Sequence, residues 1–312
     1  MFLKHLINPK ASIILLFLFL CVALVLFAAL RFDVELLFGH SFFNSFIVIL
    51  FAVIAPFFLG TGLNNIVYEK NIIRKDNLVV GFVFVLISSF FINVVEAWLS
   101  AFLLLFMFNF LAEAYQKDLP FSEFYNASFI LSLATFIYPN LILLTLVLII
   151  AGINYSNFNW RILVTIFLGL ITPQVFYFVF IFLKGMDWVF YRPVVVSKIN
   201  FLTLEELHIS KKILAIIFLV IVILSFFELF TWLYKKSIKS RRTFMTIIWF
   251  FVFTIIIAIY SGWEYFYFSF LPLSVIISNY FVYAKNRHIA NILFFLLVIS
   301  SFYYRYMIVF NV

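Results

Sequence analysis

The chain has 312 residues, of which 67% are hydrophobic and 11% are charged, and its formal net charge is +8. A soluble domain usually carries about 25% charged residues, so this composition excludes a water-soluble fold and indicates an integral membrane protein. The positive charge indicates basic residues retained on the cytoplasmic side of a membrane rather than nucleic-acid binding. Cys21 is the single cysteine, which excludes an internal disulfide and a cluster of thiolate metal ligands.

Apolar runs separated by polar breaks predict an all-α, polytopic transmembrane helix bundle of about eleven spans, in a single domain over residues 1–312. A span needs about 20 apolar residues to cross a hydrocarbon core of about 30 Å. The predicted spans are residues 12–30, 43–63, 78–95, 97–115, 127–138, 140–153, 162–183, 213–234, 243–261, 265–283 and 289–308.

Two of these predictions leave a choice of structure. The first span, 12–30, is longer than the apolar region of a typical signal peptide, so we interpret it as an uncleaved anchor. Spans 127–138 and 140–153 are each too short to cross the membrane alone. They predict either two crossings or a re-entrant pair that turns at Tyr138-Pro139-Asn140.

The distribution of lysine and arginine predicts a cytoplasmic N-terminus and an outer C-terminus. The composition, with 48 Phe, abundant Ile and Lys and 8 Gly, suggests a bacterium, and the expected location is its inner membrane. With this orientation, 185–212 is a long outer loop, and fourteen of the 21 basic residues fall in inner segments. These fourteen are Lys4, Lys10, Lys70, Arg74, Lys75, Lys117, Arg161, Lys235, Lys236, Lys239, Arg241, Arg242, Lys285 and Arg287.

Three carboxylates on the predicted outer side are candidates for chemistry. Asp33 and Glu35 follow the first span, and Glu96 interrupts a long apolar stretch between the third and fourth spans. A partly desolvated carboxylate can act as general base towards a hydroxyl, or hold a divalent cation against a phosphate. The alternatives stay open: Asp33 and Glu35 as solvated loop acids, and Glu96 as the marker of a helical turn.

Four further residues of the outer side are candidates for substrate binding, and two of them, Arg192 and Lys198, for contact with a phosphate. Arg192 and Lys198 lie in the long outer loop, and Arg31 and His40 flank Asp33 and Glu35. Arginine makes two parallel hydrogen bonds to phosphate oxygens. The alternative is contact of these side chains with lipid headgroups. The chain has no phosphate-binding glycine loop, no serine elbow and no zinc-protease motif, so neither ATP-driven nor protease chemistry is indicated.

Asp33 and Glu35 after the first span, followed by Val95-Glu96-Ala97-Trp98, resemble the C-type membrane glycosyltransferases, which use polyprenyl-phosphate sugars. Those enzymes place a carboxylate in the first outer loop and often an Arg-Glu-Ala motif at the start of the fourth span. The stretch 128–135 and the turn after it are similar to their pair of short helices. The resemblance covers roughly the N-terminal half of the chain.

This resemblance implies that Asp33 or Glu35 is the catalytic base and that Glu96 is the second acid. The chain departs from the family at Val95, where arginine is usual, and it lacks the sizeable outer domain that many members carry. The whole chain also resembles an uncharacterised family of Bacteroidota membrane proteins, a domain-of-unknown-function group, which implies no activity.

The predicted function is therefore a membrane glycosyltransferase that uses or handles a polyprenyl-phosphate-linked sugar at the outer face, for assembly of cell-envelope glycan. Its expected partners are membrane lipids, the lipid-linked sugar and a further membrane protein, and a divalent cation is the one cofactor considered. Two alternatives stay open: a non-catalytic subunit or scaffold of an envelope assembly or secretion machine, and a transporter of a small molecule or lipid, which the short helix pair around Pro139 would suit.

Overall fold

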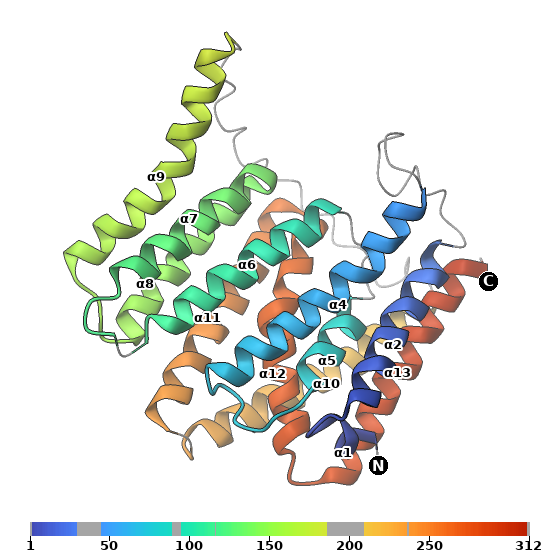
Figure 1. The fold of residues 1–312 in the computed structure, drawn as a ribbon. Helices are drawn as coiled ribbons and strands as arrows, with labels where there is room; N and C mark the ends of the chain where they lie inside the picture. The colour runs from blue at the N-terminus through green and yellow to red at the C-terminus, as the bar shows by residue number, and fades with distance from the viewer. Residues whose placement is uncertain are drawn as a thin grey trace. The chain divides into compact units, whose positions relative to one another are not determined.

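The chain is helical in a computed structural model that describes residues 2–29, 45–88, 95–115, 117–185, 209–235 and 237–310 (Figure 1). Within these ranges there is no strand, and an isolated β-bridge joins Ile7 to Asn77. The all-α prediction is confirmed. The α-helices are α1 (Phe2–Leu6), α2 (Ala11–Ala29), α4 (Ser45–Glu69), α5 (Val79–Ser88), α6 (Val95–Glu113), α7 (Phe121–Ile137), α8 (Thr145–Asn154), α9 (Trp160–Leu183), α10 (Ile209–Leu233), α11 (Ile238–Ser261), α12 (Phe270–Tyr283) and α13 (Arg287–Phe310), and two 3₁₀ helices are η1 (Pro139–Leu144) and η2 (Trp263–Ser269).

Several of these helices have the surface of a membrane protein. Six stretches of the described residues are long and apolar enough to cross a membrane: 96–113, 160–183, 209–231, 238–261, 264–283 and 287–307. In α9 and α10 only 22% of the most apolar window is buried, so most of these side chains face outwards. An apolar surface of this size is stable in lipid and unstable in water. The predicted number of about eleven spans and the predicted orientation go beyond these six stretches, and both stay predictions.

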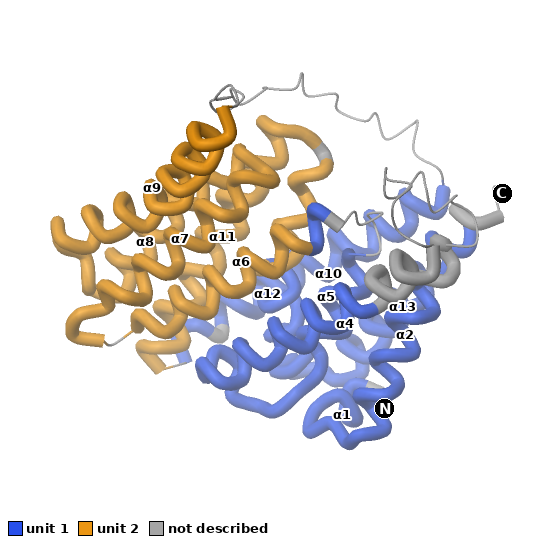
Figure 2. Tube along the Cα trace, turned by 45° about the horizontal axis from the view of Figure 1, so that its top comes forward, with its two compact units in different colours: residues 1–98, 200–236, 273–312 blue, residues 99–199, 237–272 orange. Residues whose placement is uncertain are grey.

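The chain divides into two compact units, each made of separate chain segments (Figure 2). Unit 1 contains residues 1–98, 200–236 and 273–312, and unit 2 contains residues 99–199 and 237–272. Each unit has its own packed helices. The prediction that residues 1–312 form one transmembrane domain stays a prediction.

In unit 1, helix α5 lies at the centre of the packing. All ten of its residues are buried, and it packs against α4 and α13. The contact with α4 is made by two glycines: a Cβ atom on Gly81 would lie 2.9 Å from the carbonyl oxygen of Gly60. The ring of Phe17 from α2 closes this contact and lies 4.8 Å from the ring of Phe82. Small residues thus let the two backbones approach, as is common between membrane helices.

In unit 2, helices α7 and α9 pack through an equally close contact. A Cβ atom on Gly169 would lie 2.0 Å from Ser128 Oγ and 2.6 Å from the carbonyl oxygen of Tyr125. Hydrogen bonds cross the same interface, because Ser132 Oγ donates to the carbonyl oxygen of Leu170 at 2.7 Å. Pro173 lies inside α9 and has no N–H for the carbonyl group four residues earlier. Polar side chains of α7 therefore support α9 next to this proline.

The residues of the predicted short pair, 127–138 and 140–153, are helical and belong to α7, η1 and α8, and the first helix is longer than expected. Helix α7 begins at Phe121, and Tyr138 interrupts the helical path with φ −124° and ψ 89°. The residue before a proline is disfavoured in the helical region, which explains the break before Pro139. The Tyr138 ring packs edge-on against Tyr265 and Phe268 at 5.2 and 5.0 Å. The two alternatives for this pair, two crossings or a re-entrant turn, both stay predictions.

The Gly169 contact generates a stability prediction. We expect Gly169→Ala to lower the free energy of unfolding by about 1–3 kcal/mol, because the added Cβ overlaps a backbone oxygen that cannot move away cheaply. The control is Gly152→Ala in α8, where the nearest atoms would lie at an ordinary 3.7 Å. Alanine favours a helix over glycine, so the control should be neutral or slightly stabilising. Unfolding in mixed detergent micelles measures the free energy of unfolding of both variants. Equal losses in the two variants would show that the contact at Gly169 is not unusually close.

Candidate functional site

Among the residues predicted to form the outer site, the described ranges contain Glu96. It lies in the first turn of α6, and its side chain is exposed. A carboxylate in the first turn also interacts favourably with the helix dipole, which suits the predicted helical turn as well as a site. The remaining six candidates lie outside the described residues, so their grouping with Glu96 stays a prediction: Arg31, Asp33, Glu35, His40, Arg192 and Lys198.

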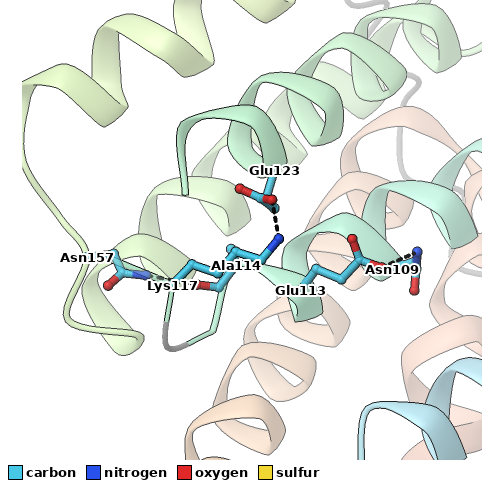
Figure 3. Close-up of polar contacts among 6 residues, drawn as sticks. All are labelled: Asn109, Glu113, Ala114, Lys117, Glu123 and Asn157. Atoms are coloured by element: carbon cyan, nitrogen blue, oxygen red, sulfur yellow. Dashed lines mark hydrogen bonds and ion pairs between the residues drawn. The ribbon is translucent and has the colours of Figure 1, made fainter. Parts of the chain in front are cut away.

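The structure gathers a different set of polar residues, which the sequence had not singled out, at helix ends of unit 2 (Figure 3). We call this set the helix-end cluster; it consists of Asn109, Glu113, Lys117, Glu123 and Asn157. Lys117 follows α6 and forms an ion pair with Glu123 in the first turn of α7. Asn109 Nδ2 donates to Glu113 Oε1 at 3.1 Å. The only hint in the sequence is the return of charged residues between spans 97–115 and 127–138.

The ion pair changes the acidity of both partners, which lie outside the predicted spans. Burial is the largest influence on Glu123 and favours its neutral form. The hydrogen bond from Lys117, hydrogen bonds from its own backbone N–H and from Ser122, and the charge of Lys117 together outweigh burial, so the pKa of Glu123 lies below its usual value. The hydrogen bond to Glu123 raises the pKa of Lys117, and the charge of Glu113 adds to this effect.

Side-chain contacts to the backbone tie the neighbouring loop to the same cluster. Asn157 Nδ2 donates to the carbonyl oxygen of Ala114 at 2.9 Å, at the end of α6 (Figure 3). Next to it, Ser156 adopts a left-handed conformation with φ +62°, and its hydroxyl accepts a hydrogen bond from Arg242 Nη1 of α11 at 2.8 Å. The last carbonyl groups of a helix have no partner within the helix, so such contacts satisfy them. The helix-end cluster thus joins the end of α6 to the start of α7 and to the loop that follows α8.

This arrangement is suited to structure more than to catalysis. A carboxylate that is paired with lysine and has a lowered pKa is a weak base at neutral pH. Among the described residues, no group of three or more His, Cys, Asp or Glu side chains is placed to hold a metal ion. We therefore interpret the helix-end cluster as a device that fixes the connection between α6 and α7.

The whole sequence, residues 1–312, matches the model of a family of unknown function, DUF6427. The chain belongs to this family. The expectation of an uncharacterised family is thus confirmed, whereas the match carries no information about the resemblance to glycosyltransferases. No curated protein and no solved structure matches the chain. For this DUF6427 protein, function therefore has to be argued from its own residues.

The Lys117–Glu123 pair generates a pH prediction. Because the pKa of Glu123 is lowered in the fold, its stabilising effect is complete above the usual value of 4.5 and is lost as the pH falls through the lower, folded value. We expect Glu123→Gln to lower the unfolding midpoint at neutral pH by about 2–4 °C. The difference from the unsubstituted protein should narrow below pH 4.5.

Thermal unfolding in nonionic detergent across this pH range measures the effect. The matched control is Glu264→Gln, which removes an exposed glutamate in the first turn of η2. A midpoint difference for Glu123→Gln that equals the control, or that stays constant through acidic pH, would show that the ion pair does not stabilise the fold.

Proposed function

We propose that this protein crosses the inner membrane of a bacterium about eleven times, with its N-terminus in the cytoplasm. The outward-facing apolar side chains of α9 and α10 support a lipid environment. The excess of lysine and arginine in alternate connections supports the orientation. In this topology α9 runs outwards from Arg161, and α10 returns inwards to Lys235.

Labelling of single cysteines tests the orientation. Cys21 is buried, and Cys21→Ser gives a background without cysteine. Lys184→Cys and Lys235→Cys place one thiol after α9 and one after α10, both at exposed positions. In intact spheroplasts, a membrane-impermeant maleimide should label the first variant and spare the second until the membrane is permeabilised. The reverse pattern would invert the topology.

We further propose that the protein acts on a polyprenyl-phosphate-linked sugar at the outer face. The observation that carries this proposal is the position of Glu96, an exposed carboxylate at the outer end of α6 in the proposed topology. In the reaction, an acceptor hydroxyl oxygen bonds to the anomeric carbon of the sugar, and the bond from this carbon to the lipid phosphate breaks. Asp33 or Glu35 takes the hydroxyl proton, and polyprenyl phosphate leaves with the bonding electrons.

The phosphate that leaves acquires negative charge, which needs a fixed positive partner. Arg31, His40, Arg192 and Lys198 belong to the outer segments of the proposed topology and carry the groups that would bind it. A divalent cation held by the carboxylates would serve the same purpose. Such a donor needs no nucleotide outside the cell, because the lipid phosphate itself is the leaving group.

Amide substitutions test the chemistry. We expect Asp33→Asn or Glu35→Gln to lower sugar transfer by about 10²–10⁴, the usual contribution of a general base, with accumulation of the lipid-linked donor in the membrane. Glu96→Gln should lower transfer as well. The control is again Glu264→Gln, an exposed acid at the start of a helix that is placed on the outer side by the same topology.

Full envelope glycan in all three amide variants, with normal membrane insertion, would exclude the enzymatic proposal. The proposal that replaces it is a non-catalytic subunit of an envelope assembly or secretion machine, for which stable co-purification with a membrane protein is the expected result.

A further inference from the structure

Unit 1 contains a pocket that none of the predicted site residues occupies. Its volume is about 420 Å³, and it is lined by α1, the connection between α4 and α5, the end of α12 and the first turn of α13. Small-molecule sites usually have volumes of roughly 300–1,000 Å³. The pocket is therefore large enough for a lipid headgroup, and it lies where the helices of this unit end.

Three positive charges from three distant parts of the chain meet at this pocket. They belong to Lys4 in α1, Lys75 before α5 and Arg287 at the start of α13. No carboxylate is among the residues that line it. All three side chains are exposed, and none of them forms an ion pair within the described part of the chain. The charges are thus available to an anion.

The backbone around the pocket is fixed before any ligand binds. The N-terminal segment pairs with the connection between α4 and α5, because Asn8 N–H donates to the carbonyl oxygen of Asp76 and Leu78 N–H to that of Leu6, at 2.9 and 2.8 Å. The buried Asn77 holds the same connection: its Nδ2 donates to the carbonyl oxygen of Lys75 at 2.8 Å. A rigid frame lowers the entropy cost of binding.

One of the basic groups has a printed side-chain contact beside the pocket, and another belongs to a helix that begins there. Lys75 Nζ lies 4.9 Å from the centre of the Tyr283 ring, so a cation–π contact orients this lysine towards the end of α12. Arg287, Ala290 and Asn291 all line the pocket, which means that the first turn of α13 faces it. Asn286 Oδ1 already accepts from the His288 N–H at 3.3 Å, so the start of α13 favours an anion mainly through the helix dipole. The helix therefore adds to the charge of the side chains.

The floor of the pocket is apolar. Leu3, Phe281, Val282 and Ala290 line it and are buried. In the wall, Asn291 Oδ1 is buried without a hydrogen-bond partner among the described residues. This oxygen accepts, so its partner would be a hydroxyl of the headgroup and not the phosphate. A basic rim over an apolar floor at helix ends suits an amphiphile better than a small soluble anion.

We propose that this pocket binds the phosphate headgroup of an anionic membrane lipid. The rim cations contact the phosphate, and the acyl chains run from the floor into the surrounding bilayer. In the proposed topology, Lys4, Lys75 and Arg287 belong to cytoplasmic segments, and the lipid is then one of the inner leaflet. This site is separate from the proposed outer reaction and does not depend on it.

The test uses the full-length protein in nonionic detergent, with phosphatidylglycerol as the anionic probe and phosphatidylcholine as the zwitterionic one, and bound lipid counted by native mass spectrometry. The test variant combines Lys4→Gln, Lys75→Gln and Arg287→Gln. The matched control combines Arg161→Gln, Lys211→Gln and Lys235→Gln, which removes the same charges from exposed positions that do not line the pocket. Thermal unfolding checks that both variants are folded.

We expect the unsubstituted protein to retain one phosphatidylglycerol and to bind phosphatidylcholine much more weakly. The pocket variant should lose at least about tenfold in affinity for phosphatidylglycerol, whereas the control should lose less than about threefold. Equal losses in both variants, or equal binding of the two lipids, would overturn the proposal. Displacement of phosphatidylglycerol by millimolar inorganic phosphate would also overturn it, because the site would then recognise free phosphate and not a lipid.

Discussion

In a chain with 11% charged residues, the backbone groups of the helices constrain everything else. Lipid offers no hydrogen bonds, so each N–H and C=O group within an apolar helix has to be paired inside the protein. The helix interiors meet this requirement by themselves, but the helix ends do not. Polar and charged side chains complete the pairing at such ends, as in the helix-end cluster around Lys117 and Glu123 and in the connection that Asn77 holds.

The same constraint explains how the helices pack. In lipid, burial of apolar surface gives little advantage to one apolar partner over another, so close backbone contact and a few hydrogen bonds determine which helices associate. Gly60 against Gly81 in unit 1 provides such a contact, and so does Gly169 against Ser128 in unit 2. Ser132 of α7 donates to the carbonyl oxygen of Leu170 in α9, the residue after Gly169, whose own carbonyl group loses its usual donor at Pro173. The close contact and the hydrogen bond between these helices thus lie side by side.

The positions of the helices could be predicted from hydropathy, and their starting points could not. Helix α11 was expected over 243–261 and begins at Ile238, while α7 was expected from residue 127 and begins at Phe121. In both cases the helix continues into charged residues that an apolar window rejects. Lys239 and Arg241 are compatible with a helix outside the hydrocarbon region, and the charge of Glu123 is neutralised by Lys117. A run of apolar residues therefore predicts the part of a helix that could cross a membrane. The helix itself can begin several residues earlier, in polar sequence outside the apolar run.

The sites were less predictable, because they depend on contacts between distant parts of the chain. The predicted outer carboxylates come from sequence neighbours, Asp33 with Glu35, and from a family resemblance that supplied Glu96. Lys4, Lys75 and Arg287 are separated by more than two hundred residues at the extremes, and the sequence assigned them only to the same side of the membrane. That assignment was a necessary condition for the pocket, since residues on opposite sides could not share it. In the proposed orientation, the same charge bias brings basic residues to one membrane surface, and unit 1 places three of them at one pocket.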